Sequence, residues 1–197
     1  MTFDPRFRLT LLPLLACALL ATGCAKKEQV RYGEAKSVET VTNQFGSTDL
    51  QTIAESMTRS LLTSEIVSSG TRPIMTVQEV KNKTSEYIDT RAITDTIRSE
   101  LQKSGRVRFA VDAAAMQQQV DELKRQQSEL YKQDQAARTG KMVGAAYRLE
   151  GNIVSIVKQN QDIKDVYYKF DLQLWNIEDG LLEWSDEKEI RKTTTKG

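Results

Sequence analysis

The sequence predicts an α/β protein with a single domain, in which helices pack on a mixed β-sheet of about five strands. Two observations lead to this class. In the first two thirds, stretches with apolar residues at helical spacing alternate with short β-branched stretches. In the last third the pattern changes to strict alternation around a turn motif, which is typical of antiparallel hairpins. Early strands separated by a helical crossover and late strands joined by hairpins make a mixed sheet covered by one layer of helices.

The first predicted helix covers 47–62, where Ser47 or Thr48 can act as the N-cap. Its apolar residues share one helical face and are Leu50, Ile53, Ala54, Met57 and Leu61. The next stretch, "IMTVQEV" (74–80), is rich in apolar and β-branched residues and predicts a strand. We expect the polar stretch after it, "KNKTSEY", to be a loop.

A second helix is predicted from about Asp89 to Ser104, because Ile93, Ile97 and Leu101 recur at four-residue steps. Asp89 or Thr90 supplies the cap, and Gly105 is a plausible left-handed stop. The stretch "RVRFAV" (106–111) then predicts a short strand.

Residues 112–144 are dense in Ala, Gln, Glu, Lys and Leu, which favours a long helical region in two pieces. Only a thin apolar stripe runs along it, formed by Met116, Val120, Leu123 and Leu130. The charge-rich remainder is interpreted as a solvated face, with a docking surface for a partner as the alternative.

Two long alternating stretches follow, at 146–158 and 165–177. Side chains on one face of the second stretch are apolar, namely Tyr168, Phe170, Leu172 and Leu174. The "EDG" motif at 178–180 favours a tight turn, so 181–192 should return as an antiparallel partner.

The N-terminus carries an export pattern, "LLPLLACALLATGCAKK" (11–27), preceded by Arg6 and Arg8. The apolar stretch 9–20 is shorter than the ~20 residues that a membrane-spanning helix needs. A cleaved secretory signal is therefore favoured over a transmembrane helix.

Small residues stand directly before Cys24 and resemble the lipobox of bacterial lipoproteins; they are Ala21, Thr22 and Gly23. In such proteins the signal peptidase cuts before the cysteine, whose sulfur then carries diacylglycerol. We therefore expect a lipoprotein signal peptide at 1–23 and lipidation of Cys24; an ordinary export signal with a chance cysteine is the alternative. Ala25 follows the cysteine where an aspartate usually means retention at the inner membrane, so the resemblance implies the outer membrane.

Behind the signal, 24–47 is predicted to be the lipidated N-terminus and a polar tether, in which Val38, Val41 and Phe45 could pack locally. The globular domain is predicted at 48–197. Cleavage would remove two of the 28 basic and one of the 27 acidic residues, so the mature chain has no net charge. This balance gives no reason to expect nucleic acid as a partner.

Catalytic groups are scarce in this chain. It contains no histidine, which removes the usual general base and the usual zinc ligand. The remaining candidates are carboxylates near Trp184, namely Glu183, Asp186 and Glu187, which would allow glycan cleavage. They lie among basic residues on a hairpin strand, where cross-strand surface pairing is the preferred interpretation. We expect no enzyme activity, metal, cofactor or small-molecule substrate.

Three stretches together resemble the LpoB family of penicillin-binding-protein activators: "FGSTDLQTIAESMTRSLL" (45–62), "GKMVGAAYRLEGNIVSIVK" (140–158) and "VYYKFDLQLWNIEDGLLEWSDEKEIRK" (166–192). The third is the most specific, with an alternating strand, an acidic-Gly turn, two apolar residues, an acidic residue and tryptophan.

The resemblance implies an outer-membrane lipoprotein facing the periplasm. It would bind the periplasmic regulatory domain of a class A penicillin-binding protein and activate it allosterically, stimulating peptidoglycan synthesis. The alternative is a non-catalytic envelope assembly or secretion-associated lipoprotein, with a domain like that of curli-export lipoproteins but without a pore.

Overall fold

The computed structural model describes residues 33–39 and 41–195. The predicted signal peptide and Cys24 lie outside these residues, and both stay predictions. By its internal contacts the chain divides into two units, Met1–Ala35 and Lys36–Gly197. Within the described ranges, no helix combines the length and the apolar content that crossing a bilayer requires.

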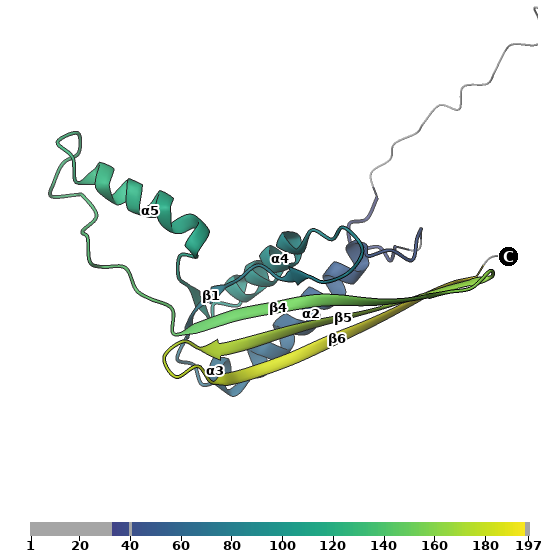
Figure 1. Ribbon diagram of the computed structural model, residues 1–197. Coiled ribbons are helices and arrows are strands. Elements are labelled where there is room, and N and C mark those ends of the chain that lie inside the picture. The colour runs from purple at the N-terminus through teal and green to yellow at the C-terminus, as the bar shows by residue number, and fades with distance from the viewer. Residues whose placement is uncertain (1–32, 40, 196–197) are drawn as a thin grey trace, which may run out of the picture. The chain divides into compact units, whose positions relative to one another are not determined.

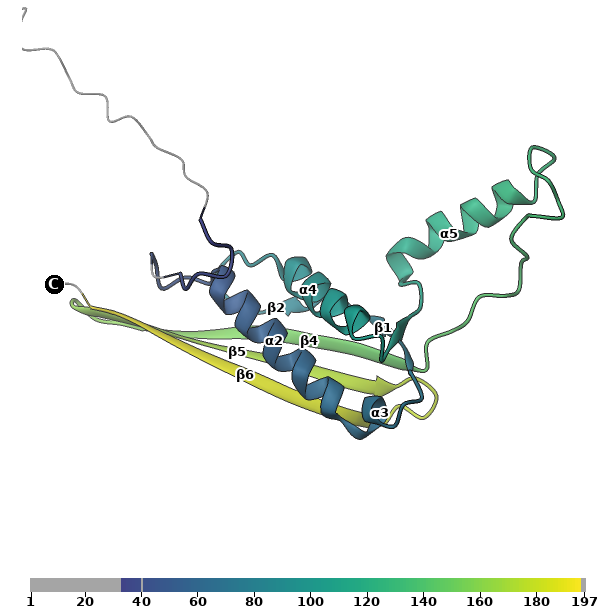
Figure 2. The same cartoon turned by 180° about the vertical axis from the view of Figure 1, so that it is seen from behind.

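The helical layer consists mainly of α2 (Ser47–Thr63) and α4 (Thr90–Lys103), with the short α3 (Glu65–Ser68) after α2. Both long helices lie on the same face of the sheet (Figures 1 and 2). The predicted apolar stripes are confirmed, since the residues at their centres are fully or almost fully buried. They are Ile53, Met57 and Leu61 on α2 and Ile93, Ile97 and Leu101 on α4.

The helix ends follow local chemistry. Asp89 caps α4, because its Oδ1 accepts a hydrogen bond from the Ala92 amide at 3.2 Å. Gly105, with φ of 67°, follows α4 in the predicted left-handed conformation. The prediction for α2 was wrong by one residue: its N-cap is Gly46, whose amide donates to Asp49 Oδ2 at 2.8 Å. Asp49 in the first turn thus accepts the amide of the cap residue, and neither Ser47 nor Thr48 is the N-cap that we expected.

The sheet has six strands, and five follow one path in the order β3-β1-β4-β5-β6. Parallel pairs join β1 to β3 and to β4, and antiparallel pairs join β4 to β5 and β5 to β6, so the mixed sheet is confirmed. The bounds are β1 Ile74–Val77, β2 Lys81–Asn82, β3 Arg108–Phe109, β4 Tyr147–Gln159, β5 Ile163–Asn176 and β6 Leu182–Thr195. β2 pairs with β4 and occupies part of the stretch predicted as a loop.

The C-terminal hairpins match the alternating pattern. Gly180, with φ of 73°, completes the turn between β5 and β6. One face of the sheet packs under the helices, and the predicted set on β5 forms its centre. Tyr168, Phe170, Leu172 and Leu174 are all at most 1% exposed.

Residues 112–143 form a projection that we call the arm, which leaves the sheet after β3 and returns to it before β4 (Figure 1). Its helix, α5, spans Ala113–Gln126, with Asp112 as the cap. The prediction of helical structure throughout 112–144 was therefore wrong beyond Gln126. The later residues have helix-favouring composition but few apolar side chains to bury, and propensity alone seldom holds a helix in water.

Of the three apolar side chains expected to pack near the end of the tether, only Phe45 does so. Its ring meets the Tyr168 ring edge-on, with 5.8 Å between centroids. Val38 and Val41 are 74% and 85% exposed, so that expectation was wrong for them.

Candidate functional site

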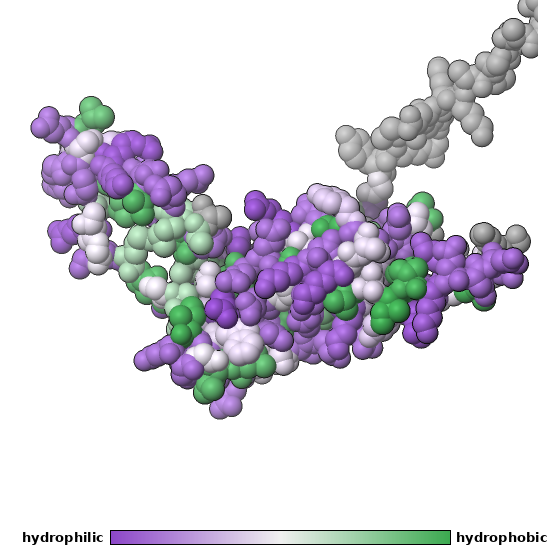
Figure 3. Space-filling view, in the orientation of Figure 1, coloured by the Kyte–Doolittle hydropathy of each residue, from purple (hydrophilic) through white to green (hydrophobic). Residues whose placement is uncertain are grey.

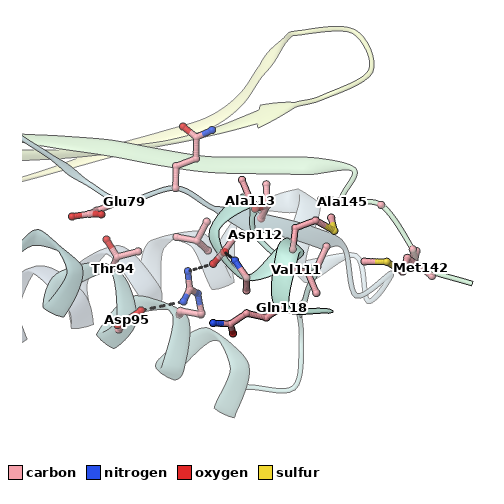
Figure 4. A pocket seen from close by; sticks show the side chains of 18 of the residues that line it. Glu79, Thr94, Asp95, Val111, Asp112, Ala113, Gln118, Met142 and Ala145 are labelled. Atoms are coloured by element: carbon pink, nitrogen blue, oxygen red, sulfur yellow. Dashed lines mark hydrogen bonds and ion pairs between the residues drawn. The ribbon is translucent and has the colours of Figure 1, made fainter. Parts of the chain in front are cut away.

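A groove of about 1030 Å³ lies where the arm leaves the rest of the domain. We call it the arm-root groove. Its walls come from four segments that are separate in sequence: the end of β1 and the loop after it (76–79), α4, the start of the arm with the two residues before it (110–118), and the end of the arm with the residues after it (142–145). Figure 4 shows these segments converging on it.

Arg98 on α4 holds one wall of the groove to the other. Its guanidinium lies 3.1 Å from Asp95 Oδ1 on the same helix and 3.5 Å from Asp112 Oδ2 at the arm root. These two contacts are the dashed lines between Asp95 and Asp112 in Figure 4. Asp112 also accepts the Ala115 amide at 2.9 Å as the cap of α5. One carboxylate therefore both starts α5 and fixes its root to α4.

The loop after β1 is held to α4 by Thr94, which is buried. Its hydroxyl donates to the Thr90 carbonyl at 2.9 Å and accepts the Val80 amide at 3.2 Å. At the outer rim, Arg91 and Glu79 form a more exposed pair at 3.8 Å. Thr94, Arg91 and Glu79 on this wall thus all have partners within the domain.

The opposite side of the groove is apolar. Val111, Met116, Met142 and Val143 line it and remain 37%, 39%, 46% and 64% exposed. Figure 3 shows apolar side chains gathered where the arm meets the body of the domain. Exposed apolar side chains that are contiguous and rimmed by polar groups are a usual mark of an interaction site.

The face of the sheet opposite the helices carries two of the three carboxylates that were considered for catalysis, Glu183 and Glu187. Glu187 pairs with Lys169 on the neighbouring strand. Glu183 accepts a hydrogen bond from Asn176 Nδ2 at 3.3 Å. Asp186 lies on the other face of β6, on the helix side, opposite Leu172. Its Oδ1 accepts the Glu187 amide at 2.7 Å. The expectation of surface pairing is confirmed for Glu187, and these three carboxylates do not converge on a common point.

Asp171 stands beside Glu187 in the register of β5 and β6. Partial burial raises the pKa of its carboxyl, and the Glu187 charge raises it further, against the opposing effect of Lys83 and Lys169. Within the described residues, no group of three or more His, Cys, Asp and Glu side chains is placed to hold a metal ion.

Both tryptophans are half-buried in the sheet. Trp184 packs against the core on the helix side. Trp175 lies on the other face, beside its cross-strand partner Arg148, and its indole N–H has no hydrogen-bond partner in the described part of the chain. Packing in the sheet accounts for Trp184.

The arm-root groove was missed by the sequence analysis because its walls lie up to about 70 residues apart in the chain. Of the predicted thin stripe of Met116, Val120, Leu123 and Leu130, only Met116 lines the groove. The docking-surface alternative was noted for the charge-rich side of this stretch and stays a prediction, and Cys24 lies outside the described residues, so its lipidation also stays a prediction.

Comparison with protein families gives one match: the model of the peptidoglycan-synthase activator LpoB fits residues 49–190. This range runs from the start of α2 nearly to the end of β6. Among curated proteins, the search found no significant match.

Several solved structures are similar to this chain. The LpoB C-terminal domain from Escherichia coli is 20% identical over 72% of this chain and 98% of that one, with a TM-score of 0.46. Lipoprotein GNA1162 from Neisseria meningitidis is 16% identical over 62% of this chain and 84% of that one, with a TM-score of 0.38. A PelC dodecamer from Paraburkholderia phytofirmans is 14% identical over 63% of this chain and 72% of that one, with a TM-score of 0.34.

Proposed function

Since the chain belongs to the LpoB family of peptidoglycan-synthase activators, we propose that it binds a class A penicillin-binding protein in the periplasm and stimulates its synthesis of peptidoglycan. The family match carries this proposal, because it spans nearly all of the helices and strands. The contact is expected on the periplasmic regulatory domain of the synthase. The activator contributes no group to the chemistry.

A non-catalytic role agrees with the side chains. The chain has no histidine, and the carboxylates considered for glycan cleavage have partners on the sheet surface or in the backbone. Activation must then work through binding energy. An activator shifts a synthase toward its active state only by the difference between its affinities for the two states.

We propose further that the protein is anchored in the outer membrane through lipid on Cys24, and that the residues after it tether the domain. A single acyl chain binds a membrane only reversibly, and stable anchoring takes at least two. A lipobox cysteine carries three chains once its amine is acylated. The domain would therefore stay permanently at the membrane while it meets a synthase from the other side of the periplasm.

Purified residues 25–197 test the activator role without the lipid. Added to the purified class A synthase from the same cell, the fragment should raise the rates of glycan polymerisation and cross-linking and should bind the synthase in a pull-down. If the fragment shows no binding and no stimulation, the proposal is refuted. Release of glycan fragments by the domain alone, lost in Glu183→Gln or Glu187→Gln, would favour the enzyme instead.

A further inference from the structure

The arm carries apolar side chains that the domain covers only in part: Met116 is 39% exposed, and Val120 and Leu123 are half-buried. Met116, Val120 and Leu123 follow one another along one side of α5, and none of the helix's described side chains is buried. A lone helix of 14 residues is only marginally stable in water. A helix of this kind gains stability when a partner covers its apolar side.

The tip of the arm is built by its own hydrogen bonds. Gln126 Oε1 accepts the Ala137 amide at 2.9 Å, and Gln127 Nε2 donates to the Ala137 carbonyl at 2.6 Å. The returning segment is thereby fixed to the end of α5. This turn leaves Leu130 and Tyr131 exposed at 85% and 41%, so apolar contacts are available at both the root and the tip.

The charges of this surface are balanced. Residues 112–143 contain five acidic and five basic side chains, which are Asp112, Asp121, Glu122, Glu129 and Asp134 against Lys124, Arg125, Lys132, Arg138 and Lys141. At the root, the Arg98 charge is already matched by Asp95 and Asp112. The surface therefore has no excess of one sign of charge that would attract a strongly charged partner. The surface fits an apolar element of low net charge.

A second copy of this chain is a poorer occupant than a larger partner. α5 is about 21 Å long, and a pair of such helices joined along three apolar side chains buries far less than the ~800 Å² per partner of a standard interface. A partner that fills the groove and also contacts the helix and the tip covers much more.

We propose that the arm-root groove together with the apolar side of the arm is the surface that docks the synthase. An apolar, weakly charged element of the synthase's non-catalytic region enters the groove beside Val111, Met116, Met142 and Val143. This inference rests on the proposed function, because it names where that contact is made.

The test uses the full chain in detergent and the purified class A synthase from the same cell. Val143→Asp in the groove and Leu130→Asp at the tip place a charge on the apolar surface. Leu181→Asp is the matched control, since Leu181 is 61% exposed, close to the 64% of Val143, and lies in the turn between β5 and β6. Affinity and synthase stimulation are measured for each, together with the thermal unfolding of the variant.

The arm variants should bind the synthase about tenfold or more weakly, as expected at the centre of an interface, and the control should bind as wild type does. All three variants should unfold at the wild-type temperature, because their side chains are exposed. Raising the salt concentration should change the wild-type affinity little, because charge pairs do not carry the contact.

The two proposals fail in different ways. If wild type stimulates the synthase and both arm variants bind it as tightly as wild type does, the proposed docking surface is wrong and the activator function stands. If wild type neither binds nor stimulates, both fail together. If Val143→Asp turns a dimer of the chain alone into a monomer, as seen in its solution mass, a second copy occupies the groove and the inference is overturned.

Discussion

Asp49 is a carboxylate with 3% of its surface exposed, and it depends on a residue 143 positions away. Lys192 near the end of β6 pairs with it and also donates to the Gln44 carbonyl at 2.8 Å. The Gly46 amide supplies a second donor to Asp49. This small network holds the residues before α2 against the last strand.

Lys192→Met should destabilise the domain by about 3 kcal/mol, because removing one partner of a buried pair leaves the other charge uncompensated. Urea unfolding followed by circular dichroism measures the change. Lys188→Met is the control: Lys188 lies on the same strand and the same face, and within the described residues it has no salt bridge. Equal losses in the two variants would show that the pair with Asp49 contributes nothing specific.

Tyr168 makes a similar link on β5. Its hydroxyl donates to Glu86 Oε1 at 2.7 Å, and Glu86 Oε2 accepts the Phe45 amide at 3.1 Å. Burial raises the pKa of Tyr168, and the hydrogen bond to Glu86 raises it further. The phenol therefore stays protonated and keeps its donor role in mildly alkaline solution.

Asp171 gives the stability a dependence on pH. Because burial raises the pKa of this carboxyl, the folded state holds its proton more tightly than the unfolded state does. Its contribution to the unfolding free energy is complete below the unfolded pKa of ~3.9 and is lost as the pH rises through the folded pKa. The stability of Asp171→Asn relative to wild type should therefore rise from pH 3.5 to pH 7. Urea unfolding of both proteins across that range measures it, and a difference that is constant with pH would contradict the assignment.

At the scale of the elements, β4 has the most neighbours in the sheet, because β1, β2 and β5 all pair with it. Gly151 lies in its middle, opposite Leu172. A Cβ atom on Gly151 would stand 2.3 Å from the Asp171 carbonyl oxygen, which belongs to the backbone and cannot rotate away. The close approach of β4 and β5 therefore requires glycine here.

Gly151→Ala should cost about 2–3 kcal/mol of unfolding free energy, because the two strands must move apart. Gly144→Ala is the matched control, since nothing lies within 4 Å of the position of its added Cβ atom. Thermal unfolding of both variants separates them. An equally stable Gly151→Ala would mean that the strands adjust at little cost.

The sequence predicted those elements whose own residue spacing reveals them, and it missed those that depend on contacts with distant parts of the chain. Ile93, Ile97 and Leu101 predicted α4 because a helix that packs on a sheet shows its buried side in its own spacing. β2 has no such pattern: Lys81 and Asn82 are both exposed, and only their pairing with Asn152 and Ile153 makes them a strand. The arm-root groove has the same origin in long-range placement, so no single stretch of sequence could indicate it.

For the whole molecule, the predicted anchor decides where the domain can work. Cys24→Ala should abolish lipidation, leave the precursor unprocessed by lipoprotein signal peptidase and prevent labelling of the protein by radioactive palmitate. The outer-membrane fraction should lose the protein, because the acyl chains provide the attachment. Continued palmitate labelling of Cys24→Ala would contradict lipidation at this residue.

The pairing of Asp49 with Lys192 also has a consequence for the order of folding. A chain made from its N-terminus onward forms α2 early, but the buried carboxylate of this helix stays without its partner until the last strand joins the sheet. Contacts between such distant parts form slowly because a long loop must close first. The domain should therefore reach its native state only after its C-terminal end is available, and a chain that stops before β6 should remain an expanded intermediate that is open to proteolysis.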